Sequence, residues 1–405
     1  MNNPSLSPDT SGDLQFDAVI IGGGIAGLWT LDRLRTSGYN AILLTDRPLG
    51  DGQTLASQGM IHGGIKYTLS GALNKASETI ADMPDYWERC LAGQGDVDLG
   101  DTNTLSDHFY MWSNSTMGKL TGFFASRAVR GRVDKVAANE RPALLQNPGF
   151  KGSLYRLVDR VLDVPSLLAN LATNNHGRLF QLSNIINRLD KDADNNAYLT
   201  LDNGTKLQAR RWILCAGKGN AGLLTALACT EPAMQLRPLQ QLIVRHRYPY
   251  PFYGHCLGAD KTPRLTISTH PSASDETVWY LGGSLAEKGA SMSASELINA
   301  GRQELAELFP WLDFSEAAFS TLPVERAEPR QKDFARPDNA FAEPACGVSN
   351  VLVGWPTKLT LAPNLANQIL AQLPPPEARN HDLAALTQQL SVPDIAPLPW
   401  EAKRD

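Results

Sequence analysis

The 405-residue sequence predicts an α/β protein (α+β overall) with a doubly wound domain around a central parallel sheet and a second domain built on a mostly antiparallel sheet. Three observations predict this class. The chain opens with a strand, a glycine-rich turn, a helix and a second strand; strand-helix alternation returns near the C-terminus; and residues 237–330 are rich in strands. A chain of this length is too long for one simple core, so two domains are expected.

The parallel sheet is predicted to begin at the N-terminus. Apolar runs at 16–21 and 41–45 read as buried strands, and the run 25–36 between them reads as a helix that Gly38 ends. This βαβ start is typical of a doubly wound sheet. Apolar residues at helical spacing then predict a long amphipathic helix over about 72–91.

The remaining elements follow from local signals. Pro165 predicts the first turn of a helix over 166–174, the stretch 185–192 reads as a strand, and Asn203 with Gly204 predicts a hairpin turn before a buried strand. Further elements are expected in chain order as strands at 240–246, 264–269 and 277–284, a helix at 294–308, a strand at 350–354 and a helix at 362–373.

Composition and net charge argue against several classes of protein and of binding site. With 37 basic and 42 acidic residues the net charge is −5, so no nucleic acid is expected as a partner. The five cysteines are odd in number and widely spaced, which disfavours a disulfide framework or a zinc site and favours a reducing compartment. The seven histidines form no metal-binding motif. Without a signal peptide or a transmembrane segment, the expected location is cytoplasmic.

The glycine-rich turn Gly22–Gly27 is a GxGxxG motif between strand and helix. Its glycines allow a tight turn and close approach to a pyrophosphate, which the helix N-terminus attracts. Asp46 ends the second strand, where a carboxylate can bind ribose hydroxyls. Together these features predict dinucleotide binding; the alternative is a structural turn with a solvated Asp46.

A second GxGxxG spans 217–222, but no apolar strand ending in an acid follows it. We therefore expect Ala216 and Gly217 to approach a cofactor held by the first motif. FAD needs more glycine-rich loops than NAD, and the stretches 56–67 ("ASQGMIHGGIKY") and 351–370 ("VLVGWPTKLTLAPNLANQIL") supply them. The cofactor predicted is FAD.

Seven stretches, taken together, carry a family resemblance. They are "DAVIIGGGIAGL", "ASQGMIHGGIKY", "LDNGTKLQARRWILCAGKGNAGLL", "RPLQQLIV", "VWYLGGS", "TLPVERAEPR" and "VLVGWPTKLTLAP". From residue 16 to about 373 the sequence resembles the flavoprotein superfamily of D-amino-acid oxidase, glycine oxidase, sarcosine oxidase and FAD-dependent glycerol-3-phosphate dehydrogenase. The stretch "MIHGGIKY" leans toward the last of these branches, with Lys66 where arginine is usual.

The resemblance implies a discontinuous FAD-binding domain and a substrate-binding domain. The FAD-binding domain is expected at 16–100, 152–230 and 331–373, the substrate-binding domain at 101–151 and 231–330, and peripheral extensions at 1–15 and 374–405. The residues predicted to contact FAD are Gly22, Gly24, Ile25, Ala26, Gly27, Asp46, Arg47, Thr54, Ala56, Ser57, Gln58, Gly59, Ile186, Ala216, Gly217, Gly354, Lys358, Leu359 and Thr360. Of these, residues 358–360 would lie near the flavin N1–C2=O edge, where a fixed cation stabilises the charge that reduction builds.

The predicted catalytic set is His62, Lys66, Tyr67 and Arg326. His62 has three interpretations, namely a polar contact to flavin or substrate, a structural histidine, or a covalent attachment point for FAD. Lys66 and Tyr67 are either substrate-side groups or a solvated pair. Arg326 falls where the superfamily usually keeps a carboxylate-binding arginine, because a guanidinium binds both carboxylate oxygens.

Alternatives remain open at these positions. Arg326 could instead pair with Glu325 or Glu328, and Arg330 is a second candidate for the substrate handle. The family's usual glycine pair after Gly354 is replaced by Trp355 and Pro356, and a bulky Trp355 beside the flavin would narrow the active site.

The function predicted is hydride transfer from a C–N or C–O carbon of a small, anionic, amino-acid-like substrate to flavin N5, with oxygen or a quinone as electron acceptor. One alternative is a glycerol-3-phosphate or 2-hydroxy-acid dehydrogenase that passes electrons to a quinone. Another is a non-catalytic flavin-binding subunit or sensor whose pocket Trp355 has closed.

Overall fold

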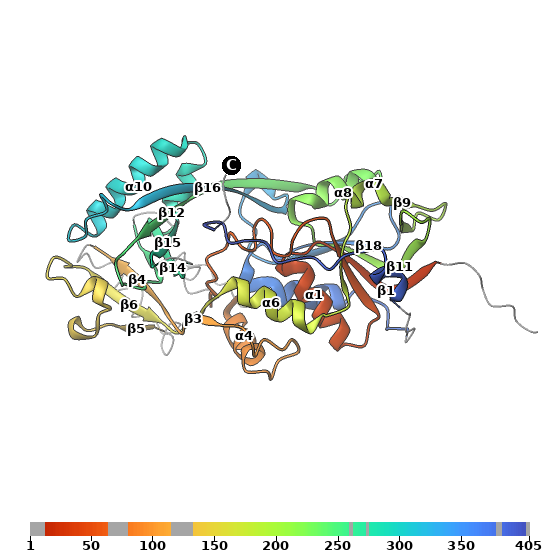
Figure 1. Cartoon of the computed structure of the whole chain (residues 1–405), viewed down its shortest axis with the longest axis horizontal. Helices are drawn as coiled ribbons and strands as arrows, with labels where there is room; N and C mark the ends of the chain where they lie inside the picture. The colour runs from red at the N-terminus through yellow and green to blue at the C-terminus, as the bar shows by residue number, and fades with distance from the viewer. Residues whose placement is uncertain are drawn as a thin grey trace, which may run out of the picture.

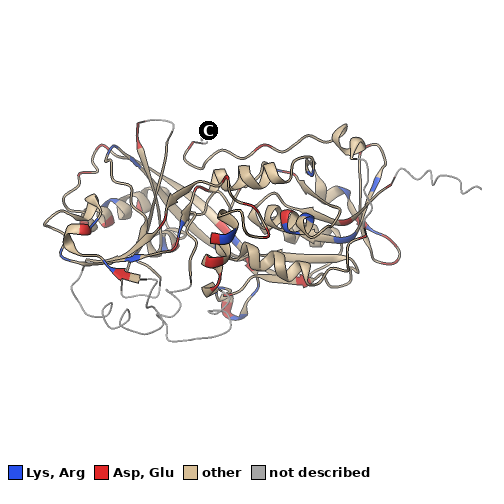
Figure 2. Cartoon of the chain, turned by 90° about the horizontal axis from the view of Figure 1, so that it is seen from below, with Lys and Arg blue, Asp and Glu red and all other residues tan. Residues whose placement is uncertain are grey.

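The computed structural model describes residues 13–63, 80–114, 133–258, 262–272, 275–377 and 383–401. These residues form two lobes side by side, each built on its own large sheet (Figure 1). Charged residues of both signs are scattered over both lobes (Figure 2). None of the helices in the described residues is long and apolar enough to cross a membrane.

The first sheet has the strand order β17-β18-β11-β1-β2-β8. Pairing is parallel from β18 to β8, and β17, β9 and β10 add antiparallel edges. The strands are β1 (Leu14–Ile21), β2 (Ala41–Thr45), β8 (Leu179–Gln181), β9 (Leu189–Lys191), β10 (Ala197–Thr200), β11 (Lys206–Leu214), β17 (Phe341–Pro344) and β18 (Val351–Trp355).

Helices cover both faces of this sheet, which is the doubly wound arrangement that the sequence predicts. Alternate residues of β1 point to opposite faces, so Ala18 and Ile20 pack into one core and Val19 and Ile21 into the other. The first core includes α1 (Ile25–Thr36), α6 (Val164–Asn174) and α11 (Ala362–Leu370); the second includes α7 (Ile185–Arg188) and α8 (Asn220–Ala226).

Local signals set several of these helices. α6 begins where the Asp163 carboxylate accepts a hydrogen bond from the Ser166 backbone N–H, with Pro165 in its first turn as predicted. The predicted bounds of α1 and β2 are confirmed. The predicted hairpin is also confirmed, because β10 and β11 pair antiparallel and the Leu201 N–H donates to the Thr205 carbonyl across the turn.

Two predicted elements are wrong in part. The stretch 185–192 was expected to be one strand, but it begins with α7 and only then enters β9, because Asn184 adopts a left-handed conformation (φ 58°) that breaks the extended backbone. The helix expected over 72–91 is interrupted at Asp82, and α4 covers Met83–Leu91. Pro84 has no N–H to donate to the turn before it, and residues 72–79 lie outside the described residues.

The second sheet has the order β16-β12-β15-β14-β13-β4-β6-β5. Only the β13–β4 pair is parallel, so the prediction of a mostly antiparallel sheet is confirmed. Its strands are β4 (Phe109–Ser113), β5 (Val133–Lys135), β6 (Ser153–Leu157), β12 (Met234–His246), β13 (Gly254–Cys256), β14 (Leu265–His270), β15 (Thr277–Gly282) and β16 (Ala318–Pro329). A small separate sheet pairs β3 (Thr104–Ser106) with β7 (Val161–Leu162).

Helices α9 (Ser284–Gly289) and α10 (Ala294–Leu308) accompany the second sheet. α10 has the predicted bounds and begins with a capping box in which Ser293 and Glu296 exchange hydrogen bonds. Its Leu297 and Leu305 pack in the same core as Trp279.

Two features differ from the predicted domain layout. β6 lies in the segment 152–230 assigned to the FAD-binding domain, yet it pairs with β4 and β5 of the second sheet. The tail was predicted to be a peripheral extension from 374, but Leu386 and Trp400 are buried. Long-range pairing decides both cases, since neither segment shows locally which sheet it will join. The division into FAD-binding and substrate-binding domains stays a prediction.

His246, at the end of β12, is predicted to make stability depend on pH. Its ring packs edge-on against Trp279 at 4.5 Å, and its Nδ1 accepts a hydrogen bond from the Tyr248 backbone N–H. Burial lowers the pKa of His246 from 6.5 to about 4. Between these values the unfolded chain binds a proton that the folded chain does not, so stability falls as pH falls from 6.5, by up to about 1.4 kcal/mol per pH unit.

Urea unfolding at pH 7 and pH 5 tests this prediction with His246→Gln. The variant should lose less stability than the wild type over this interval, by up to about 2 kcal/mol. Equal losses in the two proteins would show that His246 is not the group responsible.

Candidate functional site

The turn after β1 requires glycine. Gly22 has φ +124°, and a Cβ there would lie 2.5 Å from the Cys215 carbonyl oxygen. A Cβ at Gly27 would lie 1.9 Å from the Gly22 carbonyl oxygen. The turn therefore lets α1 begin close against β1 and β11, with its N-terminus at the carboxyl edge of the parallel sheet. This is where doubly wound folds bind phosphates.

The loop 54–59 passes over that helix N-terminus. The Thr54 Oγ1 accepts a hydrogen bond of 3.1 Å from the Ile25 backbone N–H. The Ser57 Oγ is buried, and no described residue partners it. Asp46 is exposed just after β2, while Arg47 pairs with Asp51 at 3.0 Å. The arrangement places two hydroxyls and an exposed carboxylate around one helix N-terminus.

The second sheet holds this loop in place. The Ala56 carbonyl accepts hydrogen bonds from the Tyr280 Oη (3.0 Å) and the Gln241 Nε2 (3.2 Å). The Gln58 side chain donates to the Tyr280 carbonyl at 2.7 Å, so its amide nitrogen binds the second sheet. The loop is therefore clamped between the two sheets.

The second glycine motif lies beside the first. Gly217 has φ +59° at the end of β11, and its carbonyl accepts a hydrogen bond from the Trp355 Nε1 at 3.1 Å. Trp355 is 1% exposed and packs with Phe341 at 5.8 Å in the core beneath the sheet. Its side chain packs in the core, and the expectation that it narrows the active site stays a prediction. Strand alternation turns this residue toward the core face.

The loop after β18 meets the loop at His62. Thr360 is buried; its hydroxyl accepts a hydrogen bond from the His62 backbone N–H (3.1 Å), and its carbonyl accepts one from the Trp87 Nε1 (2.9 Å). Lys358 precedes it and donates from Nζ to the Asp338 carbonyl at 3.1 Å. The structure thus brings His62 and residues 358–360 together, as the prediction of a shared site requires.

His62 lies in an aromatic group that the sequence did not single out. Its ring centroid is 5.2 Å from those of both His255 and Phe109. The next residue, Gly63, donates its N–H to the buried carboxylate of Asp159 at 2.8 Å. His255 comes from β13 and Asp159 from a loop after β6, and no local pattern connects them with residue 62.

Basic side chains gather where β12 and β16 approach the loop that contains Lys358. Arg326 lies 3.6 Å from Glu287 and donates from Nε to the Arg237 carbonyl. Arg237 binds the buried carboxylate of Glu328 at 2.7 Å. The Gln235 side chain donates both to Glu328 and to the Ala335 carbonyl, which places the neighbouring Arg336 close by. We call Arg237, Arg326, Arg336 and Lys358 the basic cluster.

The pKa values show how crowded the basic cluster is. Burial, followed by repulsion from Arg336, lowers the pKa of Lys358 to about 7. Burial, followed by repulsion from Arg237 and Arg336, lowers the pKa of Arg326 to about 10. The carboxylates of Glu287, Glu328 and Asp338 offset this repulsion in part, and an anion bound beside the basic cluster would relieve it further.

The two alternatives that the sequence left open for Arg326 and Arg330 can now be compared with the structure. Neither predicted ion pair of Arg326 forms, because Glu325 binds Lys218 at 3.1 Å and Glu328 binds Arg237. Arg330 is exposed and stacks over Phe334.

Two further predicted positions are placed by their packing. Ile186 is 41% exposed on α7, and Gly354 lies inside β18 against Leu365 and Cys215. Lys66 and Tyr67 lie outside the described residues. The contacts of all these residues with a cofactor stay predictions.

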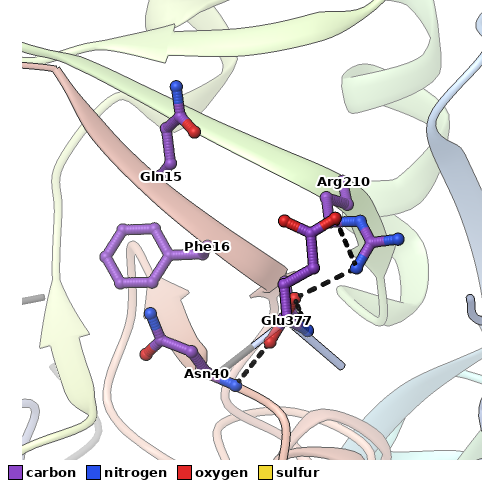
Figure 3. A pocket seen from close by; sticks show the side chains of 6 residues that line it. Gln15, Phe16, Asn40, Arg210 and Glu377 are labelled. Atoms are coloured by element: carbon purple, nitrogen blue, oxygen red, sulfur yellow. Dashed lines mark hydrogen bonds and ion pairs between the residues drawn. The ribbon is translucent and has the colours of Figure 1, made fainter. Parts of the chain in front are cut away.

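A small pocket lies at the opposite edge of the first sheet from the glycine turn, and its residues serve the structure rather than ligand binding (Figure 3). It lies at the amino end of β1, where Asp17 accepts a hydrogen bond from the Asn40 N–H and pairs with Arg210. The Asp17 carboxylate therefore holds neighbouring strands and the tail together. Ligands of doubly wound sheets bind instead at the carboxyl edge of the sheet.

Comparison with known proteins identifies the family. The family model described as FAD dependent oxidoreductase (DAO) matches residues 17–331. The chain belongs to this family. It is 45% identical over 390 residues to the protein named "Probable FAD-dependent oxidoreductase PA4991" of Pseudomonas aeruginosa, covering 96% of this chain and 98% of the relative. The crystal structure of that relative superimposes with a TM-score of 0.80 at 38% identity, covering 96% of this chain and 98% of that one.

More distant members share the fold. Glycine oxidase from Geobacillus kaustophilus matches with a TM-score of 0.63 at 16% identity, covering 92% of this chain and 98% of that one. L-α-glycerophosphate oxidase from Mycoplasma pneumoniae, solved with FAD bound, matches with a TM-score of 0.61 at 14% identity, covering 89% and 94%. The protein is thus an FAD-dependent oxidoreductase of the DAO family, and the predicted fold class and cofactor are confirmed.

Proposed function

We propose that this DAO-family oxidoreductase transfers a hydride from the C–N or C–O carbon of a small, anionic, amino-acid-like substrate to flavin N5, and passes the electrons to oxygen or a quinone. The observation that supports the substrate charge is the basic cluster, in which four basic side chains repel one another beside the carboxylates of Glu287, Glu328 and Asp338. A carboxylate or phosphate bound there gains charge-assisted hydrogen bonds.

The residues around the glycine turn fit FAD. The pyrophosphate would bind at the N-terminus of α1, where the Gly24 cap supplies no side-chain hydrogen bond. Thr54 accepts from Ile25 and keeps its hydroxyl proton for a phosphate oxygen, while Ser57 Oγ is a buried polar atom that a cofactor can satisfy. The exposed Asp46 would accept hydrogen bonds from ribose hydroxyls.

The chain's own residues would position the reaction. When bound, FAD supplies the hydride acceptor. Arg326 would orient the substrate anion through its guanidinium N–H groups. Its nearest carboxylate among the described residues, Glu287, lies 3.6 Å away and is too far to form a short hydrogen bond with it. Lys358 would supply a second hydrogen-bond donor near the flavin. The hydrogen bond from Tyr280 of the second sheet to the Ala56 carbonyl would hold the loop 54–59 in place and so help to exclude water from the flavin ring. An amine substrate that binds neutral needs no general base. His62, whose ring centroid lies 5.2 Å from that of His255, would make a polar contact to flavin or substrate.

The first experiment is an absorbance spectrum before and after acid precipitation, followed by anaerobic addition of amino and hydroxy acids. Flavin released into the supernatant means non-covalent FAD, whereas colour retained in the pellet points to attachment at His62. Bleaching by an anionic substrate, but not by its uncharged amide, supports the proposal. Re-oxidation assays that measure peroxide or a reduced quinone then separate the two acceptors. A flavin that dithionite bleaches but no substrate reduces would instead support a non-catalytic flavin-binding role.

A further inference from the structure

The end of the chain crosses from one sheet to the other. Figure 1 shows the dark blue tail running from the first lobe toward the junction of the lobes. Its first attachment is to the edge of the parallel sheet, where the Gln181 N–H donates to the Ser391 carbonyl at 2.8 Å. A second attachment is mutual, because the Leu49 N–H donates to the Asp394 carbonyl (2.7 Å) and the Ala396 N–H donates to the Leu49 carbonyl (3.0 Å).

The tail ends on the second sheet. Trp400 is 4% exposed, and its ring centroid lies 4.5 Å from that of His270 and 5.7 Å from that of Tyr280. It shares a small hydrophobic core with Ile243 and Val278. Burial of an indole ring among these side chains anchors the end of the tail on the second sheet.

Both rings beneath Trp400 are connected with the loop predicted to contact FAD. The Tyr280 hydroxyl donates to the Ala56 carbonyl, and the Tyr280 carbonyl accepts from Gln58. The Gln58 amide also donates to the Ser268 hydroxyl at 3.3 Å, which lies 2.8 Å from the His270 Nε2. Displacing Trp400 would therefore free two side chains that hold residues 56 and 58.

The tail thus binds one end of the loop 49–58 directly and supports the other end through the second sheet. Leu49, three residues after Asp46 with its predicted ribose contact, is bound directly, and residues 56–58 are held through Tyr280 and His270. We propose that residues 391–401 form a strap that keeps the loop 49–58 closed over bound FAD, with Trp400 as a positioning residue. This proposal rests on the predicted FAD contacts of that loop and goes beyond the proposed function, since it requires no particular substrate.

The test measures FAD dissociation from the purified holoenzyme, by the amount of free flavin that passes an ultrafiltration membrane at successive times after dilution into FAD-free buffer. Trp400→Ala should accelerate release by about tenfold or more, corresponding to about 1.4 kcal/mol. Trp400→Phe, which keeps an aromatic ring on His270, should restore most of the wild-type rate. Val392→Ala is the matched control on the same segment, because Val392 is 66% exposed, and it should release FAD at the wild-type rate.

A second measurement covers the case in which Trp400→Ala does not fold. In the wild-type protein, hydrogen exchange at the Leu49 and Ala396 amides should slow when FAD is added to apoprotein, because coupling between strap and cofactor is reciprocal. Equal exchange with and without FAD, or equal release rates in Trp400→Ala and Val392→Ala, would overturn the proposal. Neither readout uses a substrate, so both can succeed even if the proposed substrate class is wrong.

Discussion

Gly27→Ala should weaken FAD binding. The added Cβ would lie 1.9 Å from the Gly22 carbonyl oxygen, and that atom belongs to the backbone of the turn itself. Relief requires α1 to move away from the turn, which misplaces the helix N-terminus that would face the pyrophosphate. Overpacking of this kind costs about 1–3 kcal/mol. Where that strain must be relieved in order to place the helix N-terminus against the pyrophosphate, FAD affinity should fall by about 10- to 100-fold.

Gly222→Ala is the matched control in the second GxGxxG. There the added Cβ would meet only the Ile186 Cδ1 at 3.0 Å, and Ile186 is 41% exposed and free to rotate outward. Gly222 also lies inside α8, where alanine is the better helix former by about 1 kcal/mol. Equilibrium titration of both apoproteins with FAD is the measurement. Equal affinities would show that the first motif is not the cofactor turn, and a selective loss in Gly222→Ala would move the site to the second motif.

Arg326→Gln should lower kcat/KM for an anionic substrate by roughly 30- to 1,000-fold, because a charge-assisted contact and the unpaired anion it leaves are together worth about 2–4 kcal/mol. Arg326→Lys keeps the charge but not the two-pronged geometry, so an intermediate loss is expected. Folding should survive, because burial and repulsion from Arg237 lower the pKa of Arg326 and make its charge unfavourable in the free protein.

The matched control is Arg330→Gln, at the first residue after β16. Arg330 is exposed, and its side chain stacks over Phe334. Steady-state kinetics should therefore change by less than about twofold, as surface substitutions usually do. Similar losses in Arg326→Gln and Arg330→Gln would contradict the assignment, as would a loss in Arg326→Gln that is equal for an anionic substrate and its neutral amide.

Local patterns predicted several helices and strands closely. The βαβ start, the glycine turn and the helix 294–308 each have their signals within a few residues, namely an apolar run, a cap or a glycine, and their bounds were predicted to within two residues. Where a local signal was ambiguous the prediction failed, as at 185–192, where β-branched and polar residues fit either a strand or the short helix that follows Asn184.

The site itself depended on contacts that no local pattern contains. His255 and Phe109 meet His62 only because β13 and β4 are neighbours in the second sheet. Arg326 was predicted from the family resemblance of its stretch. Its contact with Glu287, and the ion pair that Glu328 forms with Arg237 instead, follow from the antiparallel register that sets Arg326 opposite Arg237.

Sequence alone was sufficient for the fold class and the glycine turn, because each rests on short-range constraints of chain geometry: glycine where a Cβ would clash, and apolar residues at a fixed period. The family followed from the resemblance of seven stretches of the sequence. The direction of Trp355, the composition of the basic cluster and the attachment of the tail through Trp400 required the folded chain. These features are set by which distant segments pack together, and the free energy of that packing is shared among many residues far apart in the sequence.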